Sequence, residues 1–381
     1  MREAVIVSAV RSPVGRRGGV FADLHPVELG AQVLQGLVGG VGVDPAHIDD
    51  VIWGCVGQAG EQSGDIARTT VLAAGWPLEI PGVTVDRQCG SSQQALHFAV
   101  AGVVAGHYDA VVAGGVESMT RVPMGSPRGD ADNYGPSFRA RFGQTRPNQG
   151  VGAEMIAEQW GIPREQCDEF ALLSHSRAAA AQDSGAFDDE IVPITLADGT
   201  VVTQDEGVRR GGTLEKLATL NSVFTENGTV TAASSSQMSD GSAAVLVMTA
   251  EKAAELGLTP LARVHTAVVV GSDPVIMLTG PIPATRKALE RSGLSLEEID
   301  TFEVNEAFAP VALAWLNDIG ADPAKLNPNG GAIALGHPLG GSGARLMATM
   351  IHRMRREGLQ YGLQTMCEGG GQANATIVER L

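Results

Sequence analysis

One pattern of strands and helices occurs twice along this chain. In each copy a buried-type strand is followed by alternating helices and strands, and a helix ends at glycine before a short turn that ends in Ile-Asp. The matching segments are residues 3–10 and 261–270, 37–56 and 282–304, and 106–115 and 358–371. Such a repeat predicts an α/β fold of two related halves packed face to face, with a mostly parallel sheet in the first half.

The first half is interrupted by a segment of different character. Residues 121–148 are rich in Pro, Gly, Arg and Asn and show no sustained periodicity, and helical segments follow at 152–160 and 164–184. An insertion of this length is usually functional or disordered. We therefore expect an N-terminal half formed by residues 1–119 and 229–262, an inserted loop domain at 120–228, and a C-terminal half at 263–381.

Composition excludes several classes of protein. A net charge of −16 argues against a general nucleic-acid binder, although a local group of arginines is sufficient for a small anionic ligand. The four cysteines, Cys55, Cys89, Cys167 and Cys367, are scattered without C-x-x-C spacing, which predicts a reducing compartment and no metal site. No apolar run approaches the roughly 20 residues of a membrane span. We expect a cytoplasmic protein that binds neither membranes nor nucleic acids.

Cys89 stands where a strand at 81–85 gives way to a helix that includes residues 95–105. A thiol at a helix N-terminus faces unpaired amide groups and the positive end of the helix dipole. Both effects favour the thiolate, so this position predicts a reactive cysteine with a lowered pKa. The alternative is a small buried core cysteine of no chemical importance.

Four further stretches follow or interrupt a strand and are expected to meet Cys89 in one crevice. They are NEAFA at 305–309, NPNGGAIALGHPLGGSG at 327–343, CEGGG at 367–371 and TAASSSQMSDGSAA at 231–244. Taken alone, His337 in its glycine-rich loop would more often be structural, and Cys367 would be a core residue. The glycines near residue 340 are not followed by the Gly-Lys-Ser/Thr of a phosphate loop.

These stretches occur in the order and spacing of the thiolase family, and the chain resembles that family over its whole length. The resemblance implies the thiolase fold, in which two similar halves form a five-layered αβαβα core with an inserted loop domain. It implies acyl transfer between a 3-oxoacyl-CoA and coenzyme A through an acyl-enzyme. Coenzyme A would be a cosubstrate with no permanently bound cofactor, acyl-CoA the small-molecule partner, and a homotetramer or homodimer the assembly.

The resemblance also implies a role for each marker residue. Cys89 would be the acylated nucleophile, activated by His337, and Cys367 would be the second acid/base. Asn305 would hold a water that completes one oxyanion hole with His337, and the amides of Cys89 and Gly369 would form the other. The glycines near His337 would then admit close approach of the backbone to the thioester.

Ligand contacts are implied at less prominent positions. Ser236 matches a serine that touches the pantetheine, and Arg209 matches an arginine near the nucleotide end of coenzyme A. Asn148 and Gln149 stand where short-chain members carry His-Met beside the acyl group, so they are expected to line the substrate pocket. By contrast, Cys55 and Cys167 are interpreted as structural, and His97 as a hydrogen-bonded core residue.

Several departures from the family pattern concern the pocket wall, including DRQCGSSQQA around Cys89 and CEGGGQANAT at the C-terminus. They resemble a degradative subgroup that includes actinobacterial thiolases acting on steroid fragments, and they single out residues 91–94 for substrate choice. Three alternatives stay open. One is a biosynthetic acetoacetyl-CoA thiolase, another a non-catalytic acyl-CoA or lipid-binding relative, and the third a ketoacyl synthase, which would use two histidines.

Overall fold

The computed structural model describes residues 2–144 and 146–381. Its strands are β1 (Ala4–Arg11), β2 (Gly15–Arg16), β3 (Asp50–Gly54), β4 (Val83–Val85), β5 (Ala110–Ser118), β6 (Ile194–Thr195), β7 (Val201–Val202), β8 (Ser239–Thr249), β9 (Ala262–Gly271), β10 (Thr301–Val304), β11 (Tyr361–Glu368) and β12 (Gln372–Arg380). Its α-helices are α1 (Pro26–Gly39), α2 (Ile66–Ala73), α3 (Ser91–Ala105), α4 (Gly135–Phe142), α5 (Gln149–Gln159), α6 (Arg164–Asp183), α7 (Leu214–Ala218), α8 (Ala250–Glu255), α9 (Pro281–Ser292), α10 (Ala309–Ile319), α11 (Ala332–Leu335) and α12 (Ser342–Glu357).

The strand order repeats the duplication that the sequence predicts. The first half contributes the order β4-β3-β5-β8-β1, and the second half mirrors it as β9-β12-β11-β10. β3 pairs with β5 in parallel, as β10 does with β11, and the remaining matched pairs are antiparallel in both halves. The halves join where β1 and β9 pair antiparallel over a short overlap. Two related halves are therefore confirmed.

The prediction of a mostly parallel sheet holds only for part of the first half. β4, β3 and β5 are parallel neighbours, but β8 lies antiparallel between β5 and β1. The sequence order of strands does not reveal this, because β8 enters the sheet only after the long insertion. Every residue of β5 and of β8 is buried, as expected for central strands that are covered on both faces.

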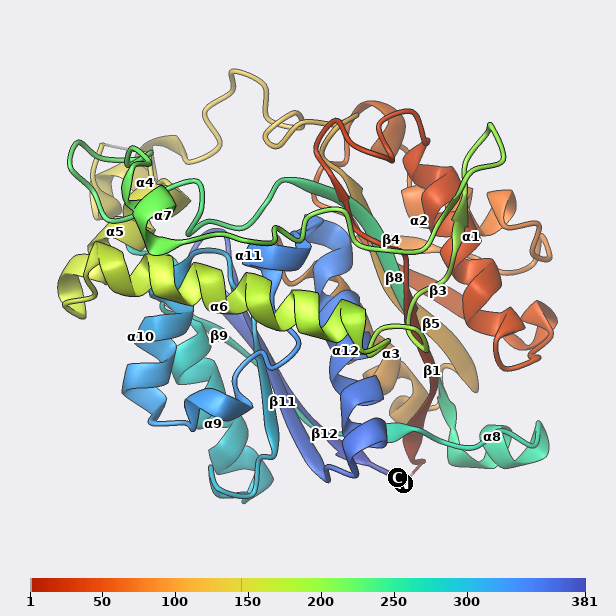
Figure 1. Cartoon of the computed structure of the whole chain (residues 1–381). Coiled ribbons are helices and arrows are strands. Elements are labelled where there is room, and N and C mark those ends of the chain that lie inside the picture. The colour runs from red at the N-terminus through yellow and green to blue at the C-terminus, as the bar shows by residue number, and fades with distance from the viewer. Residues whose placement is uncertain (1, 145) are drawn as a thin grey trace.

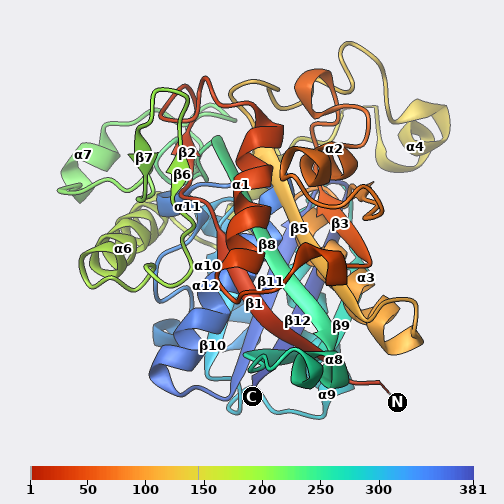
Figure 2. The ribbon, with the colours of Figure 1, turned by 90° about the vertical axis from the view of Figure 1, so that its right-hand side faces the viewer.

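Helices form layers on both sides of each half-sheet. α1 packs on the outer face of the first half, where Figure 2 shows it across β1, β8 and β5. α9 packs on the outer face of β9, β11 and β12, and α10 packs against α9. α3 and α12 contact one another, and α12 contacts strands of both half-sheets. The order helix, sheet, helix, sheet, helix is the five-layered core that the resemblance implies.

Three apolar clusters fill the spaces between these layers. The middle cluster joins Leu96 and Val103 of α3 to Met347 and Ile351 of α12, all nearly inaccessible to water. Each such burial stabilises the fold by about 1.5–3 kcal/mol. The described helices include none that is both long and apolar enough to cross a membrane.

The chain between β5 and β8 leaves the sheet and returns to it. It carries the four helices α4 to α7 and the small β6–β7 pair, and Figure 1 shows α6 crossing the front of the molecule. The part expected to lack periodicity contains α4, which has no buried residue and follows a proline-rich loop at the top of the molecule.

Candidate active site

Cys89 lies in a tight turn between β4 and α3, as its sequence position predicts. Gln88 before it has a φ of +49°, and the Gly90 amide donates to the Arg87 carbonyl at 3.1 Å. The Cys89 side chain is 4% exposed and packs against Leu346 of α12. The turn of the first half is therefore in contact with the middle-layer helix of the second half.

The Cys89 thiol is a weak acid in this setting. Burial raises its pKa to about 12, with the Glu368 carboxyl as the next contributor, while the Gly369 amide opposes the rise. The predicted lowering of this pKa is therefore wrong, because removal from water outweighs the helix end. Moreover, α3 begins only at Ser91, so Cys89 lies outside the helix. A base is needed to make Cys89 a nucleophile.

His337 lies in the loop between α11 and α12. Its Nδ1 is 2.6 Å from Ser342 Oγ, and the Ser342 hydroxyl donates to the Pro338 carbonyl at 2.9 Å. Since that hydroxyl has one proton and gives it to Pro338, it accepts from His337, which leaves the lone pair on Nε2. Burial, followed by the charge of Arg345, lowers the pKa of His337 to about 3. His337 is therefore a neutral base whose lone pair, the acceptor for a proton, lies on Nε2.

Asn305 follows β10 directly and faces His337. Its Nδ2 lies 3.3 Å from His337 Nε2. The side chain is 1% exposed, and its Oδ1 has no hydrogen-bond partner in the part of the chain that the structure describes. A buried amide oxygen without a partner is uncommon, and it marks a place where a further donor fits.

The end of β11 contributes Cys367 and Gly369. Cys367 is fully buried, and burial followed by the proximity of Cys89 raises its thiol pKa well above the ordinary value. The Gly369 amide faces the Cys89 thiol and lowers its pKa, against the effect of burial. Gly370 and Gly371 have φ values of +84° and +74°, which glycine adopts without strain. This turn brings a second thiol and a backbone donor to Cys89.

A buried carboxylate that the sequence argument missed holds the His337 loop in place. Glu117, in β5, accepts the Gly340 amide at 2.9 Å and the Val56 amide at 2.9 Å. A Cβ added at Gly340 would lie 2.6 Å from the Gly54 carbonyl oxygen. The glycines here let the His337 loop lie directly on the ends of β3 and β5. The sequence prediction was different, namely that they admit close approach of the backbone to the thioester. The sequence signal that could have identified Glu117 is the presence of an acidic residue at the end of a strand that is otherwise apolar.

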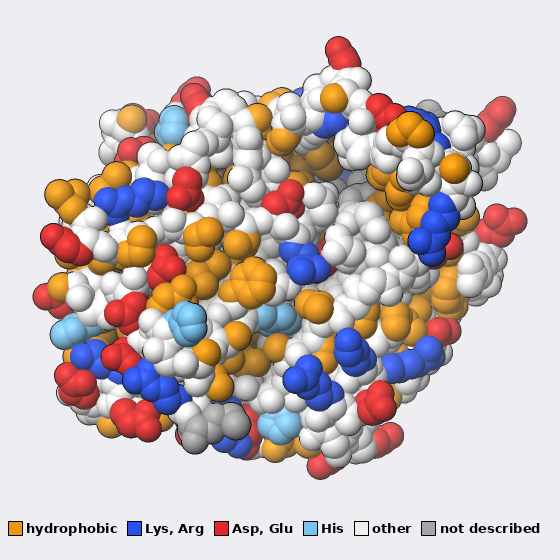
Figure 3. All heavy atoms as spheres, turned by 180° about the vertical axis from the view of Figure 1, so that it is seen from behind, with side chains coloured by type: hydrophobic (Ala, Val, Ile, Leu, Met, Phe, Trp, Pro, Cys, Tyr) orange, Lys and Arg blue, Asp and Glu red, His pale blue; other side chains and the backbone are white. Residues whose placement is uncertain are grey.

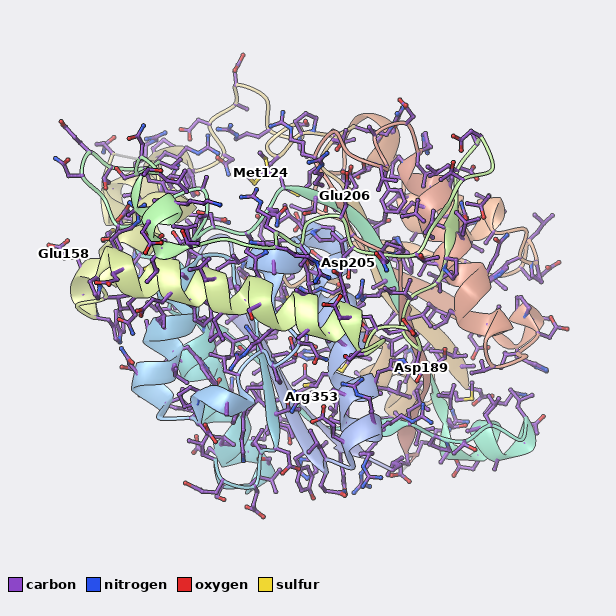
Figure 4. The ribbon with its side chains drawn as sticks, in the orientation of Figure 1. Met124, Glu158, Asp189, Asp205, Glu206 and Arg353 are labelled. Atoms are coloured by element: carbon purple, nitrogen blue, oxygen red, sulfur yellow. The ribbon has the colours of Figure 1, made fainter. Side chains whose placement is uncertain are left out.

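A cavity of about 690 Å³ opens beside Cys89. Asn148 and Gln149 line it, as predicted. Its apolar lining comes from Val122, Met124, Pro127, Tyr134, Phe224, Met277, Phe308 and Leu339, among others. Seen from behind, the upper part of the molecule is hollowed and hydrophobic side chains line the hollow (Figure 3). Met124 lies at the loop above the body of the protein (Figure 4).

Residues 91–94, which the sequence singled out for substrate choice, do not line this cavity. They are buried in the first turn of α3, where the Ser92 hydroxyl accepts the Ala344 amide and Gln93 donates to Thr376. These side chains therefore stabilise the contact between the two halves. The cavity wall instead comes largely from residues 122–150, a segment whose lack of periodicity concealed its fold from sequence reasoning.

The two residues expected to contact coenzyme A lie on loops. The Ser236 amide donates to the Ala307 carbonyl at 2.9 Å, which puts TAASSS beside NEAFA. Arg209 is exposed, and its side chain forms no ion pair with the described residues, whereas Arg210 pairs with Asp183 at 2.8 Å. The structure thus distinguishes two arginines that are equivalent in sequence.

The remaining sequence interpretations concern packing. His97 is buried and its Nε2 lies 2.7 Å from Thr376 Oγ1, so a hydrogen-bonded core histidine is confirmed. Cys55 and Cys167 are fully buried as well. Within residues 2–144 and 146–381, no group of three or more His, Cys, Asp or Glu side chains is arranged to hold a metal ion.

Comparison with known proteins shows the family of this chain. Residues 4–251 match the thiolase N-terminal domain and residues 258–380 match the thiolase C-terminal domain. The steroid 3-ketoacyl-CoA thiolase FadA6 of Mycobacterium tuberculosis is 50% identical over 100% of this chain and 95% of its own length. A 3-ketoacyl-CoA thiolase of Aliivibrio fischeri is 47% identical, with both chains fully covered.

Among solved structures, the acetyl-CoA acetyltransferase of Bacillus anthracis superposes with a TM-score of 0.91 at 41% identity, covering 100% of this chain and 99% of that one. The fold and the sequence lead to the same conclusion, and the structure places Asn305 beside His337 and Cys367 near Cys89. This chain belongs to the thiolase family.

Proposed function

We propose that this enzyme catalyses the CoA-dependent thiolytic cleavage of a 3-oxoacyl-CoA, which yields acetyl-CoA or propionyl-CoA and a shortened acyl-CoA. The observation that carries the proposal is the neutral His337, whose Nε2 lone pair faces Asn305, together with the neighbouring buried thiols of Cys89 and Cys367. The relatives named 3-ketoacyl-CoA thiolase support this direction of reaction.

The first half-reaction forms an acyl-enzyme. His337 Nε2 takes the Cys89 proton as the sulfur attacks the 3-keto carbon, because a thiol of raised pKa is not ionised beforehand. The amides of Cys89 and Gly369 donate to the developing oxyanion. The bond between C2 and C3 then breaks, and the released enolate accepts hydrogen bonds from protonated His337 and from a water held by Asn305.

The second half-reaction releases the shortened acyl group. Cys367 gives its proton to C2 of the enolate, which completes acetyl-CoA, and the resulting Cys367 thiolate then deprotonates incoming coenzyme A. The CoA thiolate attacks the acyl-enzyme carbonyl, Cys89 departs, and His337 returns its proton to Cys89. Protons balance over the cycle, and no metal or redox cofactor takes part in these steps.

Other residues would bind rather than react. Ser236 and Arg209 would contact the pantetheine and nucleotide ends of coenzyme A, and Asn148 and Gln149 would contact the acyl group. The apolar cavity of about 690 Å³ supports an acyl group larger than acetyl, including the ring-containing groups of a steroid fragment. The Mycobacterium tuberculosis relative is named a steroid 3-ketoacyl-CoA thiolase, and this name supports the same class of acyl group.

The assembly we propose is a cytoplasmic homotetramer or homodimer, in which residues 120–228 act as a loop domain inserted into the N-terminal half. Leu72 of α2, Leu78, Val83 of β4 and Phe98 of α3 are exposed around β4, at one end of the strand order. Neighbouring exposed apolar side chains of this kind favour a protein interface. Free, widely spaced cysteines favour a reducing compartment.

The decisive test measures loss of magnesium-enolate absorbance when the enzyme, coenzyme A and a series of 3-oxoacyl-CoAs are combined. Cys89→Ser should abolish both turnover and the acyl-enzyme seen by mass spectrometry. Cys367→Ala should stop turnover but leave acylation of Cys89 by a simple thioester partly intact. Equal acylation of both variants, or a folded wild-type enzyme that cleaves no chain length, would contradict the proposal.

A further inference from the structure

Two arginines line the substrate cavity without a carboxylate partner. Arg128 and Arg146 belong to its wall. Arg128 is half-buried, its Nε is inaccessible to water, and that atom has no hydrogen-bond partner among the described residues. Neither arginine forms an ion pair with any described residue, although the chain carries a net charge of −16. Arg146 is exposed at the same wall. A partly buried guanidinium without a partner, such as that of Arg128, costs free energy unless a ligand neutralises it.

Three other arginines in this part of the chain do have carboxylate partners. Arg121 pairs with Glu61, Arg139 with Asp132 at 3.0 Å, and Arg164 with Asp168 at 2.8 Å. The two cavity arginines instead share the cavity wall with apolar side chains such as Met124, Pro127 and Tyr134.

The acidic residues of the cavity wall are already engaged. Glu117 accepts from the amides of Val56, Gly57 and Gly340 and from Gln62, so both of its oxygens are used. Asp86 accepts the Gln88 amide at 2.6 Å and belongs to the turn that carries Cys89. Negative charge therefore lies at the Cys89 end, whereas the unpaired positive charge lies on the segment from 121 to 148.

We propose that the acyl group of the substrate carries a carboxylate remote from the thioester, and that Arg128 and Arg146 bind it. The inference rests on the proposed thiolase function and narrows its substrate to CoA monothioesters of 3-oxo diacids. The apolar wall holds the carbon skeleton, and the guanidinium groups pair with the terminal carboxylate through charge-assisted hydrogen bonds.

Phosphate groups of coenzyme A present the same chemistry to an arginine, so the test must separate the two anions. The substrates are the CoA monothioester of 3-oxooctanedioic acid, its neutral ω-methyl ester, and 3-oxooctanoyl-CoA, which has the same carbon number. All three contain coenzyme A, and only the first contains a free carboxylate. The measured quantity is the ratio of kcat/KM for the diacid to kcat/KM for each neutral analogue.

In the wild type we expect this ratio to be about 10 or more, since charge-assisted bidentate contacts are among the stronger hydrogen bonds of proteins. Arg128→Gln and Arg146→Gln should each lower the ratio by about tenfold, and Arg128→Lys should retain part of it. Arg141→Gln is the matched control, because Arg141 is an exposed arginine of α4 that lies outside the cavity wall. Its ratio should equal that of the wild type.

A ratio near one in the wild type would overturn the inference. A second result would also overturn it. If the arginine variants lose activity equally toward all three substrates and their KM for coenzyme A rises, the bound anion is a phosphate group of coenzyme A. Calorimetric binding of the products, adipyl-CoA against hexanoyl-CoA, tests the same preference in Cys89→Ser without turnover. An enzyme that prefers adipyl-CoA but cleaves nothing would reject the proposed function and keep the carboxylate site.

Discussion

His337 and Ser342 form a 2.6 Å contact that determines which imidazole nitrogen carries the proton. Because Ser342 donates its only proton to the Pro338 carbonyl, His337 must donate from Nδ1, and Nε2 is left as the basic atom beside Asn305. Ser342 begins α12, so the first turn of a middle-layer helix orients the proposed base.

Ser342→Ala should therefore lower kcat while leaving KM for coenzyme A nearly unchanged. Without the hydroxyl, His337 divides between two tautomers and its ring loses an orienting contact, which we expect to lower kcat by about tenfold or more. Steady-state kinetics alongside thermal unfolding would measure it. Ser292→Ala, which removes a hydroxyl bonded to the Leu289 carbonyl at 3.0 Å in α9, is the control. A wild-type kcat in Ser342→Ala would show that the tautomer is set elsewhere.

Glu368→Gln should make Cys89 more reactive. The Glu368 carboxyl lies against Gly90, where a Cβ would meet its Oε1 at 2.0 Å, and it contributes to the raised pKa of Cys89. A negative charge disfavours a nearby thiolate, so its removal lowers the thiol pKa from about 12 and increases the thiolate fraction at any pH below that value.

Alkylation of Cys89 by iodoacetamide, followed by peptide mass spectrometry, measures this effect. Burial raises the pKa of Glu368 itself to about 8. The difference between the variant and the wild type should therefore grow as the pH rises through that value and ionises the wild-type carboxyl. Slower or unchanged alkylation in Glu368→Gln above that pH would be inconsistent with the electrostatic effect. Glu290→Gln, at an exposed position of α9, is the control.

Glu117→Gln should destabilise the enzyme and impair turnover together. Each Glu117 oxygen accepts two N–H groups, and the glutamine NH2 would face two of these donors in a buried site. The loss is expected to be about 2 kcal/mol or more of unfolding free energy. Thermal and urea unfolding would measure it, and Glu290→Gln again supplies the isosteric control. A variant as stable as the wild type would mean that Gly340 and Val56 find other acceptors.

Arg209→Ala should raise KM for coenzyme A by about fivefold to tenfold, since one phosphate contact contributes about 1 kcal/mol. Arg210→Ala is the neighbouring control, because Arg210 already pairs with Asp183 on the surface. Initial rates at varied coenzyme A concentration would separate the two variants. An equal effect in both would assign the result to general surface charge, and no effect in either would remove Arg209 from the binding site.

Much of this protein was evident from its amino-acid sequence, because the evidence was local. The duplication, the breaks after each strand and the identities of Cys89, His337, Asn305 and Cys367 depend on the order of residue types. The positions of these residues at strand ends and in glycine-rich turns follow from backbone preferences that act over a few residues.

Other properties depended on the tertiary structure. The pKa of Cys89 rises because burial removes the thiol from water and because the Glu368 carboxyl disfavours the thiolate. Neither effect is visible in the strand–helix junction that suggested a lowered value. The glycines near residue 340 serve the contact between the halves, and residues 91–94 do the same. The cavity wall is formed instead by the segment that holds Arg128 and Asn148, together with residues of other segments. Proximity between distant segments, and the exclusion of water that comes with it, determined which sequence interpretations were correct.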